Sequence, residues 1–122
     1  MSKQSNNPKI EWCPIKGKEC LKFTFLGTLT ESEALDAIAK WKEMFSTKKE
    51  EKTVIIWQCL EMESYEPMAR ILWQGAIKEL KNQIDKVWLV SDSIVIQAGA
   101  KIMAFFTTLD LRVVNSEEKI IL

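Results

Sequence analysis

The sequence predicts one α/β domain, built on a mixed sheet of about five strands with three to four helices. Three observations lead to this class. Near the N-terminus, two short β-prone runs flank a glycine turn, and further along, apolar strands alternate with stretches of helical periodicity. A length of 122 residues suits one domain. We expect the polar residues 1–8 to form a disordered tail and residues 9–122 to form the domain.

The first two strands are expected over residues 10–15 and 20–26, joined by Lys16-Gly17-Lys18. Gly17 can supply the positive φ that a tight turn requires, so the two strands should form an antiparallel hairpin. Apolar and polar residues alternate in the second strand, as in a strand with one wet face. Cys13 and Cys20 flank the turn and could face each other across it, but we expect free thiols.

A first helix is predicted through Ser46, because Thr30 and Glu33 form a capping box and apolar residues then recur at helical spacing. Residues 53–59 follow as a strand. Its continuous apolar run is typical of a central strand that is covered on both faces.

The second helix is expected to begin near Pro67, which the first turn of a helix tolerates. Its predicted buried stripe consists of Met68, Ile71, Leu72, Gly75, Ala76 and Leu80. Trp73 and Ile77 lie off this stripe and form a second apolar line. Such a line is a candidate surface for a partner.

Residues 87–90 read as another buried strand, and any residue of Ser91-Asp92-Ser93 can cap the third helix. That helix has a predicted stripe of Val95, Ala98, Gly99, Ile102, Met103 and Phe106. Residues 111–114 form the last strand, and a short terminal turn or fourth helix is expected to open at Asn115-Ser116. Strands joined through helices are parallel neighbours, so the hairpin should lie at one edge of the sheet.

Composition excludes several functions. Seventeen basic and seventeen acidic residues leave no net charge, which argues against nucleic-acid binding. There is no histidine, no Gly-rich nucleotide motif and no Cys-x-x-Cys pair, so we predict no cofactor, no metal and no enzymatic activity. The polar N-terminus and the absence of a long apolar run predict a cytoplasmic protein without an integral membrane segment.

The junction between the strand over residues 53–59 and the second helix is the strongest candidate site, because α/β proteins place chemistry where strands end. The predicted turn offers Glu61, Glu63, Ser64, Tyr65 and Glu66. The glutamates read as a solvated acidic rim, with paired acid–base carboxylates or a hard-metal site as the alternative. Ser64 reads as a helix N-cap, with a regulatory phosphorylation site as its alternative.

Five tryptophans are many for a chain of this length. Trp57 and Trp88 lie in predicted central strands and Trp73 lies in the second helix, so these three could converge on one apolar pocket near the strand ends. Filling of the core is the simpler interpretation.

The order of elements resembles the STAS fold. The resemblance rests on the hairpin leading into Leu26-Gly27-Thr28-Leu29-Thr30, on Ser91-Asp92 after the strand over residues 87–90, and on the ending Val114-Asn115-Ser116-Glu117-Glu118. Within this superfamily the chain looks like stand-alone bacterial SpoIIAA-like proteins related to anti-sigma factor antagonists, and more distantly like CRAL-TRIO lipid-binding domains.

In the antagonists, a kinase phosphorylates a serine at the start of the corresponding helix. The matching positions here read Tyr65-Glu66-Pro67-Met68, and proline has no hydroxyl to accept phosphate.

The resemblance therefore implies a non-enzymatic signalling module that binds a protein partner without this phosphorylation. We predict that the partner contacts Glu61, Glu63, Ser64, Tyr65, Glu66, Trp73 and Ile77. The alternative is a carrier or sensor of a small hydrophobic, lipid-like ligand held among Trp57, Trp73 and Trp88. Pairing through a free edge strand or the second helix would instead give a homodimer.

Overall fold

The computed structural model describes residues 6–48 and 51–121. Across these residues the strands are β1 (Lys9–Ile15), β2 (Lys18–Leu29), β3 (Thr53–Tyr65), β4 (Ile84–Val90) and β5 (Leu111–Val114). The helices are α1 (Glu31–Ser46), α2 (Pro67–Leu80) and α3 (Ile94–Thr107), with short 3-10 turns at Lys81–Gln83 and Glu117–Lys119. The predicted order of elements is confirmed.

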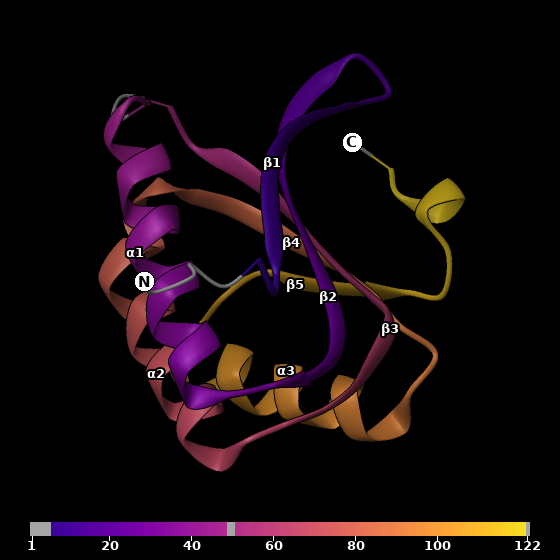
Figure 1. Cartoon of the computed structure of the whole chain (residues 1–122). Coiled ribbons are helices and arrows are strands. Elements are labelled where there is room, and N and C mark those ends of the chain that lie inside the picture. The colour runs from indigo at the N-terminus through magenta and orange to yellow at the C-terminus, as the bar shows by residue number, and fades with distance from the viewer. Residues whose placement is uncertain (1–5, 49–50, 122) are drawn as a thin grey trace.

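The described strands form one mixed sheet in the order β1-β2-β3-β4-β5. β1 and β2 pair antiparallel as the predicted hairpin, and every later pair is parallel. When strands follow one another in chain order, crossovers of one hand place all of their helices on the same face. Figure 1 shows this arrangement: α1, α2 and α3 lie on one side of the sheet and the C-terminal segment lies on the other.

The larger core lies between the sheet and the helices. Its centre is an aromatic cluster in which Trp41 and Trp73 have ring centroids 5.4 Å apart and Phe23 meets both rings edge-on. A smaller core covers the opposite face of the sheet, where Ile120 packs on Val54, Ile56, Trp88 and Val90. β3 is therefore covered on both faces, as its apolar run predicts.

The local signals at the hairpin and at two helix starts are confirmed. Gly17 has a φ of 84° and Lys16 a φ of 49°, as a two-residue hairpin turn requires. Cys13 lies directly opposite Cys20, and both are free thiols. Thr30 closes the capping box of α1, and Ser93 caps α3.

The chain is ordered earlier than the predicted tail over residues 1–8 implies. The Asn7 amide donates to the Leu26 carbonyl at 2.8 Å and accepts from the Leu26 N–H at 2.9 Å, and Pro8 is buried. The side chain of Asn7 thus pairs with the backbone of β2 as a further strand residue would. Residues 1–5 of that predicted tail lie outside the described residues.

Both α2 and α3 are rotated from their predicted orientations. In α2, Trp73 is 3% and Ile77 0% exposed, whereas Met68 and Ile71 of the predicted stripe face solvent. The buried residues of α2 are Ala69, Trp73, Ala76, Ile77 and Leu80, which also follow helical spacing. This orientation of α2 is more stable because it buries Trp73 in the aromatic cluster.

In α3 the predicted stripe is only partly buried. Val95, Ile102 and Phe106 are exposed, and the face toward the sheet carries Ile96, Gly99, Ala100, Met103 and Thr107. The helix thus turns its small residues inward.

Candidate functional site

β3 passes directly into α2 without the predicted turn. The strand continues to Tyr65, which pairs with Leu29 at the end of β2. Glu66 occupies the N-cap position of α2 and Pro67 its first turn. Ser64 therefore lies within the strand and is not the helix N-cap. Its hydroxyl lies 2.8 Å from the Thr28 hydroxyl on the neighbouring strand.

Two bulges interrupt the pairing of β2 with β3. Thr24 pairs with Gln58 but Leu26 pairs with Glu61, so β3 contains one more residue than β2 over this step. Between Gly27 and Thr28, β3 again contains one more residue than β2. Such bulges re-aim side chains and are frequent beside functional sites.

The bulges decide which residues of β3 face the helices. Trp57 and Cys59 face them, and strict alternation would continue with the glutamates at 61 and 63. Because each bulge shifts the alternation by one residue, Met62 and Tyr65 take the helix-facing places instead. Glu61 and Glu63 are left exposed to solvent.

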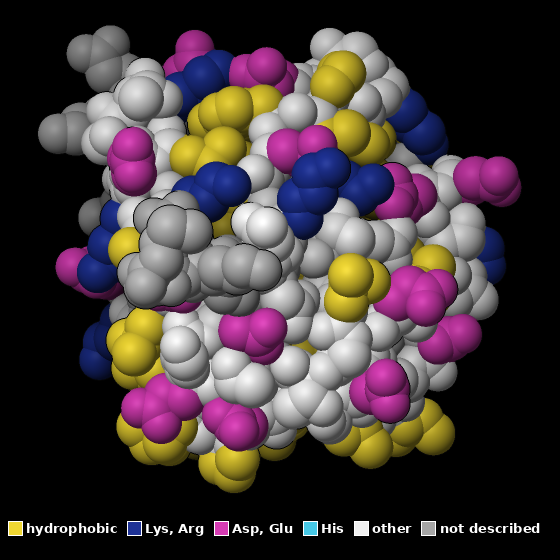
Figure 2. Space-filling model, viewed as in Figure 1, with side chains coloured by type: hydrophobic (Ala, Val, Ile, Leu, Met, Phe, Trp, Pro, Cys, Tyr) yellow, Lys and Arg dark blue, Asp and Glu magenta, His cyan; other side chains and the backbone are white. Residues whose placement is uncertain are grey.

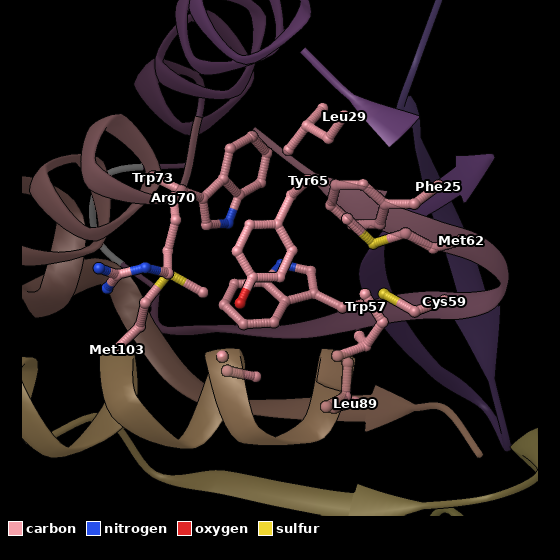
Figure 3. Close-up of a pocket in the computed structure, with 13 residues that line it drawn as sticks. Phe25, Leu29, Trp57, Cys59, Met62, Tyr65, Arg70, Trp73, Leu89 and Met103 are labelled. Atoms are coloured by element: carbon pink, nitrogen blue, oxygen red, sulfur yellow. The ribbon is translucent and has the colours of Figure 1, made fainter. Parts of the chain in front are cut away.

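These side chains line an apolar cavity between the sheet, α2 and α3 (Figure 3). Its volume is about 50 Å³. The lining residues come from β2, β3 and β4, mostly from their C-terminal halves, and from the two helices: Phe25, Leu29, Trp57, Cys59, Met62, Tyr65, Arg70, Trp73, Leu89, Ile96, Gly99, Ala100 and Met103. Parallel α/β sheets bind ligands at this end of their strands.

Two of the three predicted pocket tryptophans meet in this cavity. The rings of Trp57 and Trp73 have centroids 6.4 Å apart and cross at 65°. Trp88 is not part of it, because it pairs with Ile56 and so points to the opposite face of the sheet. There its ring lies beneath the guanidinium of Arg112, 5.8 Å from the ring centroid. The predicted position of Trp88 in the pocket is therefore wrong.

Few polar groups reach the cavity. The Trp57 indole is 3% exposed, and its Nε1–H has no hydrogen-bond partner among the described residues. Tyr65 crosses the cavity and places its hydroxyl against Gly99 of α3. Burial raises the pKa of the Cys59 thiol far above its ordinary value, which keeps this thiol protonated and unreactive. The cavity thus offers a surface for binding and no activated nucleophile.

Arg70 and Ala100 of the wall were not singled out from the sequence. Arg70 is half-buried at the edge of the cavity, and its guanidinium donates to Gln74 at 3.4 Å. Gly99 and Ala100 make room opposite β3. The available signal was the run of small residues Ala98-Gly99-Ala100 in α3.

The acidic residues predicted to bind a partner do not form one cluster. One carboxylate oxygen of Glu66 accepts a hydrogen bond from the N–H of Glu31 at 2.6 Å, at the start of α1. Glu61 and Glu63 are exposed. Across residues 6–48 and 51–121, no group of three acidic or cysteine side chains is placed to hold a metal ion.

The largest exposed apolar side chains lie on α3. Phe105 is 78% and Phe106 65% exposed, and Ile94, Val95 and Ile102 share the outer side of this helix. Figure 2 shows hydrophobic side chains along the edge where Figure 1 places α2 and α3. No helix within the described part of the chain is long and apolar enough to cross a membrane. The predicted partner surface on Trp73 and Ile77 is wrong, because both side chains are buried.

Comparison with known proteins identifies the fold. The sequence matches no protein-family model and no curated protein. The structure is similar to the crystal structure of an uncharacterised DUF3478-family protein with a SpoIIAA-like fold from Shewanella loihica PV-4. The two chains are 13% identical, the TM-score is 0.77, and the match covers 97% of this chain and 94% of the other. The chain therefore has a SpoIIAA-like fold, as the STAS resemblance predicts.

Proposed function

We propose that this protein binds a small apolar molecule between β3, α2 and α3 and acts as a carrier or sensor of it. The observation that carries this proposal is the cavity at the carboxyl ends of the parallel strands, with Trp57 and Trp73 in its wall. Ligand sites of this kind are concave and mostly apolar and contain a few polar groups. The protonated Cys59 supports binding without catalysis.

The size of the cavity sets a condition on binding. A volume of about 50 Å³ holds only a few atoms, whereas pockets for drug-sized ligands measure about 300–1,000 Å³. Part of the wall must therefore move when a ligand enters. Met103 is suited to this because a methionine side chain is flexible, and the hydroxyl end of Tyr65 packs on Gly99, where there is no side chain.

The alternative function, docking of a protein partner in signalling, is favoured by a different observation. The outer side of α3 exposes several large apolar side chains, among them Phe105 and Phe106, and contiguous exposed apolar surface often marks a protein interface. Pairing of two copies through this side is the simplest form of such docking. Glu61 and Glu63 remain candidate partner contacts because they are exposed.

Filling the cavity tests the ligand hypothesis. Ala100 lines the cavity, whereas Ala98 lies on the exposed side of the same helix, so Ala100→Val and Ala98→Val form a matched pair. The neutral probe N-phenyl-1-naphthylamine should bind the wild type and Ala98→Val with one-to-one stoichiometry and should bind Ala100→Val much more weakly. Equal binding by all three folded proteins would place the probe outside the cavity and contradict the proposal.

Self-association tests the docking hypothesis separately. Sedimentation velocity over a range of concentrations should show dimers of the wild type and monomers of a Phe105→Ser variant. A wild type that remains monomeric at every concentration would argue against pairing through α3. Because neither phenylalanine lines the cavity, Phe105→Ser should leave probe binding unchanged.

A further inference from the structure

The polar groups that reach the cavity are almost all hydrogen-bond donors. Indole nitrogens donate only, a guanidinium donates only, and a protonated thiol is a weak donor. In the wall these groups belong to Trp57, Trp73, Arg70 and Cys59, and Tyr65 adds a hydroxyl that can donate as well. Among the described residues, no carboxylate and no amide side chain lines the cavity. A complementary ligand must therefore supply an acceptor.

The buried donor of this set has no protein partner. Trp57 Nε1–H finds no acceptor within the described residues, although the side chain is 3% exposed. Figure 3 shows the nitrogens of Trp57 and Trp73 on the sides of their rings that face Tyr65, so both are directed into the space that the tyrosine shares. A buried N–H without an acceptor costs free energy, and a ligand oxygen at this place would recover it.

The charged donor at the edge is also without a counter-ion. The arginines of the chain are Arg70 and Arg112. Arg112 is exposed and forms an ion pair with Asp110 at 3.2 Å, whereas Arg70 has no carboxylate within ion-pair distance across residues 6–48 and 51–121. The nearest acid in sequence that could reach it, Glu66, is bonded to the start of α1.

We propose that the cavity takes an apolar carboxylate, such as a fatty acid or an aryl acid, with its carboxylate among the donors of Arg70, Tyr65 and Trp57 and its apolar body among the aromatic rings. This inference rests on the proposed ligand-binding function and names the ligand class. A guanidinium binds a carboxylate through two parallel hydrogen bonds, which gives both affinity and orientation.

Matched probes test the ligand class. Isothermal titration calorimetry would compare straight-chain carboxylates from butyrate to dodecanoate with the alcohols of the same chain lengths, all below their micelle concentrations. At the best chain length, the carboxylate should bind at least about tenfold more tightly than the alcohol, because a charge-assisted hydrogen bond typically gives that factor or more. The chain-length optimum reports how far the cavity opens.

Substitution of Arg70 tests the assigned position. Arg70→Met keeps the apolar stem and removes the charge, so it should abolish the preference for carboxylates and leave binding of the alcohols nearly unchanged. Arg70→Lys should retain part of the preference. Arg112→Met is the matched control on the opposite face of the sheet and should behave as the wild type.

A second pair of variants tests the buried donor. Trp57→Phe removes the unpartnered N–H in the cavity, and Trp88→Phe removes the equivalent unpartnered N–H on the other face. Only Trp57→Phe should weaken carboxylate binding.

The outcomes separate this inference from the proposed function. Alcohols that bind as tightly as carboxylates, or a carboxylate preference that survives Arg70→Met, would overturn the ligand class while the apolar site stands. If neither series binds and N-phenyl-1-naphthylamine also fails to bind, the proposed function itself is refuted.

Discussion

Replacing Gly99 by alanine should displace Tyr65 from the cavity. An ideal Cβ at Gly99 would overlap Tyr65 Oη and would lie 2.9 Å from Tyr65 Cζ. Atoms do not approach this closely, so the tyrosine ring must move. The helix cannot easily move instead, because Ile96 and Ala100 on either side of Gly99 are buried against the sheet. The close approach of α3 to β3 thus depends on the missing side chain at Gly99.

Gly75 provides the matched reference for the magnitude. It lies on the exposed side of α2, and an added Cβ there would have no atom within 4 Å. Alanine is favoured over glycine inside a helix by about 1 kcal/mol, so Gly75→Ala should raise the free energy of unfolding by about this amount. Gly99→Ala has the same helical gain, but it must also expose part of the Tyr65 ring, which costs about 1–2 kcal/mol. Its net effect should be zero or negative.

Urea unfolding followed by far-ultraviolet circular dichroism measures these differences without relying on the tryptophans. The free energy of unfolding of Gly99→Ala should be at least about 1 kcal/mol lower than that of Gly75→Ala. In a Tyr65→Ala background the obstacle is gone, and Gly99→Ala should then stabilise the protein by about 1 kcal/mol.

Two results would refute this reasoning. One is an equal gain from both glycine substitutions in the wild-type background. The other is a double-mutant cycle without coupling between Gly99 and Tyr65. Either outcome would mean that the tyrosine does not lie against α3 in solution, and the cavity would then have a different wall.

Three further predictions concern the rest of the fold. Burial acts to raise the pKa of Glu117, but hydrogen bonds from Lys22 and Gln58 outweigh it and hold the pKa below the ordinary value of 4.5. A lowered carboxyl pKa gives stability that is lost as the pH falls through it, so urea titrations between about pH 5 and pH 3 should show a steeper loss for the wild type than for Glu117→Gln. Ile120→Ala should cost about 2 kcal/mol or more of unfolding free energy, because this fully buried side chain covers the smaller core. Thr30→Ala should cost about 1 kcal/mol in thermal or urea unfolding by opening the capping box of α1.

Each of these three predictions has an outcome that would contradict it. Parallel pH profiles for the wild type and Glu117→Gln would mean that the Lys22 interaction is absent in solution. An Ile120→Ala variant as stable as the wild type would show that the C-terminal segment does not pack on the sheet. A Thr30→Ala variant as stable as the wild type would show that Glu33 or solvent caps the helix without the threonine.

Local signals in the sequence were sufficient for the order of elements. The Lys16-Gly17 turn and the Thr30 capping box each depend on residues close in the chain, and the structure confirms both. The chain order of the parallel strands also followed from connectivity alone. These features can be predicted without knowing which residues far apart in the sequence are in contact.

The orientation of side chains depended on distant contacts and could not be read from periodicity. α2 and α3 are apolar on more than one side, so each has two acceptable stripes, and packing selects between them. Trp88 shares a face with Ile56 through the register of β3 with β4, and no sequence pattern states that register. The bulges that bring Met62 and Tyr65 into the cavity are visible only in the pairing with β2.

Which side of α3 faces the sheet matters for the proposed function. Turning Ile102 and Phe106 toward the sheet would bury two large side chains, each worth about 1.5–3 kcal/mol, and would fill the cavity. The fold instead places Gly99 and Ala100 there and leaves both large residues exposed. The same rotation would turn Ile96 away from the sheet, so the two orientations differ less in apolar burial than in the space that they leave beside Trp57. This space between Trp57 and the small residues of α3 supports binding of a ligand as the proposed role of this end of the sheet.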